Sequence, residues 1–381
     1  MRSVASRARA LVLVPLLAAC AGAPKAASVS TTGHGSAAPR QELPSLDDRA
    51  ILEAMRGAAV PGLAVAYLRD CRVERVATYG VVDADSLAPV TPATLFEAAS
   101  LSKPVFAYLV MQLVDSGRID LDAPIARTLE YPRIRDRERY AAVTPRLALS
   151  HSTGLPNWSG RPRDWERTDS LTFAFAPGAA FRYSGEGYQL TQVYAELLTG
   201  RSLQELFRAS LGEVMPASVF GGPLPAGAMP AFGHDTAGSR AGGRAIGQWD
   251  RGNAAFTLRT TVEDYARFVA RVCDGAGLSR AVHAEMLRPR VRLVGDEQGA
   301  DPARIEAELG WTLGWGTQTT GDRTIHFHWG DNGPFKAFTA FDAASRRGLV
   351  YFANAARGLE LMEALAAPVV GSVRPIAVWL D

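Results

Sequence analysis

The hydrophobic and polar positions of the first part of the folded chain predict a helix and then a hairpin. Residues 46–58 carry apolar side chains on one side at helical spacing, and Pro61 and Gly62 end that helix. Residues 62–68 and 73–82 are rich in strand-forming side chains and are separated by a short polar turn. We therefore expect two antiparallel strands directly after the helix.

A second group of strands is predicted near the other end of the chain. Strand patterns occupy residues 310–318, 324–329, 335–341 and 349–353, and a closing helix follows at about residues 358–370. Neither group alone has enough strands to protect its edges, so we expect the two groups to join in one sheet.

Residues 100 to about 270 are mainly helical and rich in loops. They form a helical lobe inserted into an α/β lobe that is built from residues 46–99 and about 271–375. The sequence therefore predicts one α/β (α+β) domain with two lobes, and the place where two lobes meet is the usual position of a ligand site.

The first residues have the pattern of a signal peptide. Arg2, Arg7 and Arg9 precede a short apolar run at residues 10–17. This run is too short to cross about 30 Å of hydrocarbon, so residues 1–19 are predicted to be removed rather than to anchor the chain as a helix.

The residues just before Cys20 are small and apolar, and they resemble the lipobox of bacterial lipoproteins. In that family the cysteine is lipidated after cleavage, so the resemblance implies a membrane anchor at Cys20 and a protein that faces the periplasm. Ala21 after the cysteine favours the outer membrane. Cleavage of an ordinary signal peptide after another alanine is the alternative. Residues 20–45 are small and polar, which is typical of a flexible tether.

Composition and charge exclude several classes of protein. Hydrophobic residues make up 47% and charged residues 21%, which is not the composition of a disordered chain. The 41 basic residues nearly balance the 39 acidic ones, and they form no basic stripe, so nucleic-acid binding is disfavoured.

Apart from Cys20, the chain has two cysteines, Cys71 and Cys273. They are able to pair, but their spacing matches no disulfide framework. His326 and His328 share a strand face without a third ligand, so no metal or other cofactor is expected.

Ser100 and Lys103 are the first candidates for chemistry. The apolar residues that follow them recur at helical spacing, which places Ser100 near the start of a helix and Lys103 about one turn away. A serine hydroxyl becomes a good nucleophile when a neighbouring base takes its proton, and a desolvated lysine can do this. The same four residues also fit a helix cap followed by a surface lysine.

Two later motifs favour the chemical interpretation. Tyr183-Ser184-Gly185 follows Ser100, and His328-Trp329-Gly330 ends a predicted strand further on. In this order the three motifs resemble those of the serine β-lactamase and penicillin-binding superfamily. The branch with class C β-lactamases, D-alanyl-D-alanine carboxypeptidases, D-aminopeptidases and related esterases is the most similar. The resemblance covers about residues 46–370 and implies the β-lactamase/transpeptidase fold.

The resemblance also implies a role for each matching residue. Ser100 is the acylated nucleophile, Lys103 is its partner, and Tyr183 shares the work of a general base with Lys103, either as a phenolate or by sharing a proton. Substrate would lie along the strand that carries His328 and Gly330. The backbone N–H groups of Ser100 and Asp331 would form the oxyanion hole.

The sequence departs from the family at two positions. Gly185 stands where the family usually has asparagine, and His328 stands where β-lactamases have lysine. Both changes argue against efficient β-lactam hydrolysis, and Gly185→Asn is expected to improve lactam acylation. His151 is interpreted as structural rather than as a base. Trp311 and Trp315 fit equally well as walls of the acyl pocket or as core aromatics.

These observations predict a lipid-anchored, monomeric serine hydrolase. It would act through an acyl-enzyme on a small-molecule or peptide substrate with an amide or ester bond. A binding protein without catalysis on the same scaffold is the alternative, because a fold alone does not fix a function. A purely structural envelope lipoprotein has only the tether in its favour.

Overall fold

The computed structural model describes residues 47–162, 164–293 and 308–380. The predicted signal peptide, Cys20 and the tether lie outside these residues. The described residues belong to one compact unit, residues 43–381.

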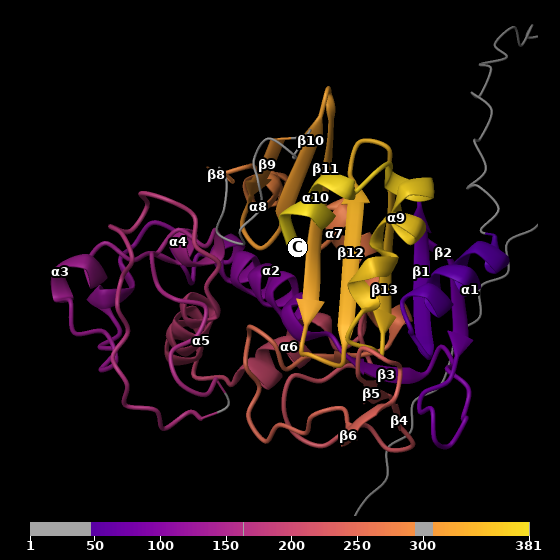
Figure 1. Ribbon diagram of the computed structural model, residues 1–381. Coiled ribbons are helices and arrows are strands. Elements are labelled where there is room, and N and C mark those ends of the chain that lie inside the picture. Colours follow the sequence, from indigo (N-terminus) through magenta and orange to yellow (C-terminus); the bar gives the residue numbers. More distant parts are fainter. Residues whose placement is uncertain (1–46, 163, 294–307, 381) are drawn as a thin grey trace, which may run out of the picture. The chain divides into compact units, whose positions relative to one another are not determined.

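An eight-stranded antiparallel sheet forms the centre of this unit, with the order β2-β1-β13-β12-β11-β10-β9-β8 (Figure 1). The strands from both ends of the sequence meet where β1 pairs with β13, so the prediction of one shared sheet is confirmed. The strand bounds are β1 (Gly62–Arg69), β2 (Arg72–Gly80), β8 (Val291–Arg292), β9 (Glu308–Trp311), β10 (Gly316–Thr320), β11 (Arg323–Asp331), β12 (Lys336–Asp342) and β13 (Arg347–Ala353).

Both faces of the sheet are covered, which explains why β1 is apolar at nearly every position. Successive side chains of a strand point to opposite faces. Leu63, Val65 and Tyr67 of β1 belong to one core, and Ala64, Ala66 and Leu68 belong to the other. Helices α1 (Asp48–Gly57), α9 (Met362–Val370) and α10 (Arg374–Leu380) pack in the first core, and α7 (Val262–Asp274) packs in the second (Figure 1).

A disulfide between Cys71 and Cys273 joins the turn of the first hairpin to α7. The pairing that the sequence left open is therefore present in the structure. Helix α7 packs against β1, β2 and β13, so the predicted lobe boundary near residue 271 falls inside a helix that lies on the sheet.

The segment between the two strand groups is rich in loops, as expected, and helices are its main regular elements, although none lies between residues 211 and 262. It starts with a short 3-10 turn, η1 (Ala99–Leu101), that leads into α2, and this places Ser100 at a helix start as predicted. The longer helices are α2 (Ser102–Asp115), α5 (Gly185–Thr199), α6 (Leu203–Leu211) and α8 (Arg280–Leu287), and the shorter ones are η2 (Ile125–Arg127), α3 (Arg137–Tyr140) and α4 (Pro145–Leu149). Two small sheets accompany them, formed by β3 (Thr94–Glu97), β4 (Met229–Pro230) and β7 (Arg259–Thr260), and by β5 (Phe232–His234) and β6 (Arg240–Ala245).

Two predicted elements differ from the structure. The single strand expected at residues 310–318 is wrong, because a tight turn separates β9 from β10. Gly314 in that turn has a φ of 100°, which only glycine adopts without strain. The closing helix at residues 358–370 begins as the 3-10 helix η4 (Gly358–Leu361), and the helix α10 after it was not predicted.

Candidate active site

Ser100 and Lys103 lie together at the start of α2, as their spacing predicted. Lys103 Nζ is 3.0 Å from Ser100 Oγ and donates a hydrogen bond of 2.9 Å to the carbonyl oxygen of Ala255. Ser100 is partly exposed, whereas Lys103 is buried. Ala99, just before the serine, has a φ of 48°, a strained conformation for a residue with a side chain. The surrounding structure thus holds the backbone just before the serine in a strained conformation.

The surroundings of Lys103 favour its uncharged form. Burial lowers the pKa of Lys103 well below its usual value. Burial also lowers the pKa of His151 well below its usual range, and the charges of Lys103 and His328 act in the same direction. A neutral amine has a free lone pair, so Lys103 is able to accept the proton of Ser100.

Tyr183 lies beside this pair. Its ring centroid is 4.7 Å from Lys103 Nζ. Burial raises the pKa of Tyr183 well above its usual value, a hydrogen bond with Ser100 lowers it, and the charge of Asp331 raises it further. The phenol therefore keeps its proton at rest. Of the two alternatives that the sequence left open, the geometry favours a proton shared with Lys103 over a resting phenolate.

His328 lies on β11 and is fully buried. Its Nδ1 is 2.8 Å from the carbonyl oxygen of Trp329, to which it donates a hydrogen bond. Burial lowers the pKa of His328 to about 3, and the charge of Lys103 lowers it too. The imidazole is therefore neutral at physiological pH and supplies no positive charge for a substrate carboxylate.

Gly330 allows β11 to pack directly against the backbone that leads to Ser100. A Cβ atom on Gly330 would lie 2.4 Å from the carbonyl oxygen of Ala98. Asp331 follows as the last residue of β11. The carboxylate of Asp331 bonds to Lys336 Nζ at 2.5 Å and accepts a hydrogen bond from the Gly333 N–H at 2.8 Å.

A buried carboxylate that the sequence analysis missed connects this loop to the nucleophile strand. Glu97 Oε1 accepts a hydrogen bond of 2.6 Å from the Gly247 N–H, and Oε2 accepts one of 2.5 Å from Asn332 Nδ2. Glu97 ends β3, and Asn332 follows Asp331. Glu97 is the ionisable residue of the short buried strand just before Ser100. This was the signal in the sequence that could have identified it.

His151, Trp311 and Trp315 have structural roles. For His151 this is the role that the sequence favoured. Its Nδ1 accepts a hydrogen bond of 2.9 Å from the Ser184 N–H, and its ring centroid lies 4.3 Å from that of Tyr183. The imidazole thus fixes the backbone and the ring beside the base. Trp311 and Trp315 are fully buried, so they are core aromatics rather than exposed walls.

The structure leaves no room for a side chain at position 185, which the sequence interpreted as the loss of an asparagine amide. A Cβ atom on Gly185 would lie 2.4 Å from Cζ2 of Trp158 and within 2.8 Å of two further ring atoms. The indole occupies the place where a side chain at position 185 would begin. Sequence spacing gave no sign of this contact, because Trp158 lies on a different loop.

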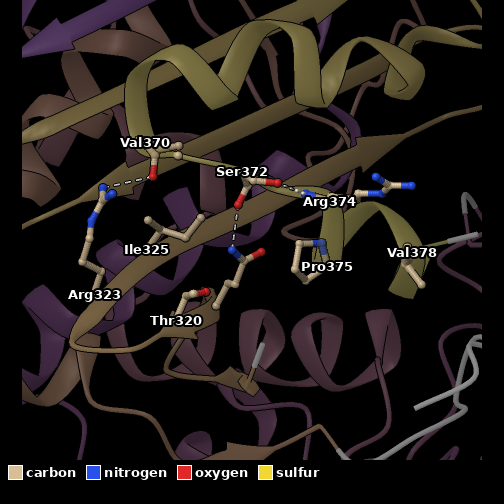
Figure 2. A pocket seen from close by; sticks show the side chains of 10 residues that line it. Thr320, Arg323, Ile325, Val370, Ser372, Arg374, Pro375 and Val378 are labelled. Carbon is tan, nitrogen blue, oxygen red and sulfur yellow. Dashed lines mark hydrogen bonds between the residues drawn. The ribbon is translucent and has the colours of Figure 1, made fainter. Parts of the chain in front are cut away.

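A separate cavity of about 570 Å³ lies between β10, β11 and the two C-terminal helices (Figure 2). Arg323 at its edge donates to the carbonyl oxygen of Val370 at 3.1 Å. The cavity shares no residue with the catalytic set. It is lined by Gln318, Thr320, Arg323, Ile325, Val370, Gly371, Ser372, Arg374, Pro375 and Val378.

Two further findings concern the part of the chain that the structure describes. No helix in it is long and apolar enough to cross a membrane. No group of three or more His, Cys, Asp or Glu side chains in it is arranged to hold a metal ion. His326, which shares a strand face with His328, lies 3.2 Å from the carbonyl oxygen of Leu287 through Nε2.

The fold and the arrangement of Ser100, Lys103 and Tyr183 define the class of serine hydrolases with a β-lactamase fold. The family model described as Beta-lactamase matches residues 48–369, and the chain therefore belongs to the Beta-lactamase family.

Known relatives within this family have several activities. Penicillin-binding protein 4 of Amycolatopsis lactamdurans is 31% identical over 163 residues, which are 40% of this chain and 42% of that protein. Esterase EstB of Burkholderia gladioli is 33% identical over 129 residues, which are 28% of this chain and 33% of the esterase. The chain thus matches less than half the length of these relatives. A solved class C β-lactamase has a TM-score of 0.69 at 20% identity, over 84% of this chain and 93% of that one, and it shows the fold alone.

Proposed function

We propose that this protein is a serine hydrolase that cleaves neutral carboxylic esters through an acyl-enzyme on Ser100. The observation that carries the proposal is the buried amine of Lys103, whose pKa burial lowers, at 3.0 Å from Ser100 Oγ. A desolvated amine at this distance has the protonation state and the position of a general base.

The reaction has two halves. Ser100 Oγ attacks the ester carbonyl while its proton moves to Lys103, and the backbone N–H groups of Ser100 and Asp331 stabilise the oxyanion. The tetrahedral intermediate collapses, and the alcohol leaves with a proton that Lys103 returns through the phenol of Tyr183. Water then attacks the acyl-enzyme and gives its proton to the same pair. The acid is released, and Ser100 regains its hydrogen.

The charges near Ser100 favour a neutral substrate. His328 is uncharged where β-lactamases carry a lysine, and its pKa is held at about 3. Asp331, beside the proposed oxyanion hole, is an acid whose partner Lys336 is already engaged at 2.5 Å. His328 would therefore give a substrate carboxylate no cationic partner, whereas a simple ester needs none. The esterase among the relatives is consistent with this choice.

The test compares kcat/KM for 4-nitrophenyl butyrate and for a chromogenic cephalosporin in the wild-type protein and in Ser100→Ala. Ser116→Ala, in the exposed cap of the same helix α2, is the matched control. We expect faster turnover of the ester than of the cephalosporin, loss of both in Ser100→Ala, and full activity in Ser116→Ala. A wild-type protein that binds the ester without turnover would favour the binding-protein alternative.

We also propose that the protein is exported to the bacterial envelope and anchored by a lipid on Cys20, facing the periplasm. The disulfide between Cys71 and Cys273 supports an oxidising compartment. Cys20→Ser is expected to release an active enzyme from the membrane fraction. Wild-type protein that is found entirely in detergent-free soluble extracts would contradict the anchor.

A further inference from the structure

The indole of Trp158 covers the backbone two residues beyond Tyr183. An ideal Cβ on Gly185 would lie 2.4 Å from Cζ2 and 2.6 Å from Cη2 of this ring. Real Cβ atoms do not approach an aromatic ring so closely, so glycine at position 185 and tryptophan at position 158 fit as a pair. The indole of Trp158 thus occupies the place that a side chain at position 185 would take.

Hydrogen bonds fix the loop that carries Trp158 to the first turn of α5. The Gly185 N–H donates to Asn157 Oδ1 at 3.0 Å, and the Glu186 N–H donates to the Asn157 carbonyl oxygen at 3.1 Å. In the other direction, the Ser159 N–H donates to Glu186 Oε1 at 3.0 Å. The residues before and after Trp158 are therefore both held.

Glu186, which anchors this loop, is itself held firmly. Its side chain is fully buried and pairs with Arg133 at 2.6 Å and with Arg167 at 3.2 Å. A buried carboxylate that is paired and hydrogen-bonded in this way has little freedom to move. The position of Trp158 is therefore set before any substrate binds.

Trp158 continues into a row of aromatic rings. Its ring meets Phe256 edge to face, with centroids 5.5 Å apart, and Phe256 meets Trp249 in the same way at 5.6 Å. The carbonyl oxygen of the neighbouring Ala255 holds Lys103 Nζ, and that of Phe256 accepts from Asn332 Nδ2 at 3.3 Å. The row therefore runs past the base toward the loop after β11.

We infer that Trp158 forms the wall that receives the acyl group of the substrate and makes the enzyme selective for flat, apolar acyl groups such as arylacetyl. The inference rests on the proposed ester hydrolysis. Trp158 lies against the backbone of Gly185, two residues beyond Tyr183, and it is only partly buried. An aromatic contact favours a ring of the substrate by about 2- to 12-fold over a methyl group of the same ester class.

The experiment compares 4-nitrophenyl phenylacetate with 4-nitrophenyl acetate, which have the same leaving group. Trp158→Ala should lower kcat/KM for the phenylacetate, relative to the acetate, by about 2- to 12-fold. Trp158→Phe should keep most of the preference. Trp165→Ala is the matched control, because Trp165 is also partly exposed and packs instead on Arg251. It should leave the ratio unchanged, and an unchanged ratio in Trp158→Ala would overturn the inference.

A binding measurement separates this inference from the proposed function. In the Ser100→Ala background, which needs no turnover, the affinity for the phenylacetate ester should fall about 2- to 12-fold when Trp158→Ala is added. Equal affinity in the two proteins overturns the inference even if the wild-type enzyme hydrolyses esters. Weaker binding without any wild-type hydrolysis would support the wall and contradict the hydrolase.

Discussion

Glu97→Gln is the substitution that best tests how the loop after β11, which begins at Asn332, is held in place. The carboxylate accepts two hydrogen bonds, from the Gly247 N–H and from Asn332 Nδ2. Glutamine has the same shape but only one side-chain oxygen, so its NH₂ group must face one of the two donors. One hydrogen bond to a charged group is lost, which destabilises the fold by about 1.5–3 kcal/mol.

The effect on catalysis follows from the place of Asn332, next to Asp331, whose backbone N–H we propose as an oxyanion donor. Loss of one oxyanion donor typically lowers kcat by about 100- to 1,000-fold. A displaced loop weakens this donor without removing it. We therefore expect a fall in kcat of about 10- to 100-fold with little change in KM. Asn332→Ala removes the same contact and should give a similar loss of kcat.

The assay combines urea unfolding with ester kinetics on Glu97→Gln, Asn332→Ala and the double variant. Because both changes act through one contact, their effects on kcat should not add. Glu53→Gln is the control, since its ion pair with Arg49 is exposed and should change neither quantity by much. A stable Glu97→Gln enzyme with kcat within twofold of wild type would refute a positioning role for Glu97.

Three further predictions concern other parts of the molecule. Gly185→Asn should destabilise the fold by about 1–3 kcal/mol, because it displaces Trp158, and should not improve lactam acylation; an unchanged melting temperature would contradict the tight contact. Replacing both Cys71 and Cys273 by alanine opens a link across 202 residues and should lower the free energy of unfolding by about 2–5 kcal/mol in urea titrations, and a change below about 1 kcal/mol would contradict this. Because burial lowers the pKa of Lys103, kcat/KM for a neutral ester should fall only as the pH drops through that lowered pKa; activity that appears only above about pH 10, the usual pKa of lysine, would exclude the neutral amine.

The candidate catalytic residues could be identified from the sequence because three short motifs follow one another in an order that resembles the serine β-lactamase and penicillin-binding superfamily. Ser100 and Lys103 are one helical turn apart, and His328 and Gly330 lie on one strand. The sheet followed from the same kind of local pattern, since nearly every residue of β1 is apolar and both faces of β1 are buried.

The contacts that orient these candidate catalytic residues could not be predicted from the sequence. The carbonyl oxygen of Ala255 holds Lys103 across 152 residues, and a backbone carbonyl leaves no mark on the residue type. Glu97 and Asn332 meet across 235 residues. Gly185 was interpreted as a missing amide, because the sequence does not indicate that the ring of Trp158 fills the space.

The most direct test of the account is to trap the acyl-enzyme and locate it by mass spectrometry. The wild-type protein, Ser100→Ala and Lys103→Met are each incubated with an arylacetyl ester, quenched in acid, weighed intact and digested. We predict one acyl adduct on the peptide that contains Ser100, no adduct in Ser100→Ala, and much slower formation in Lys103→Met. An adduct on any other residue, or labelling of Ser100→Ala at the wild-type rate, would contradict the account.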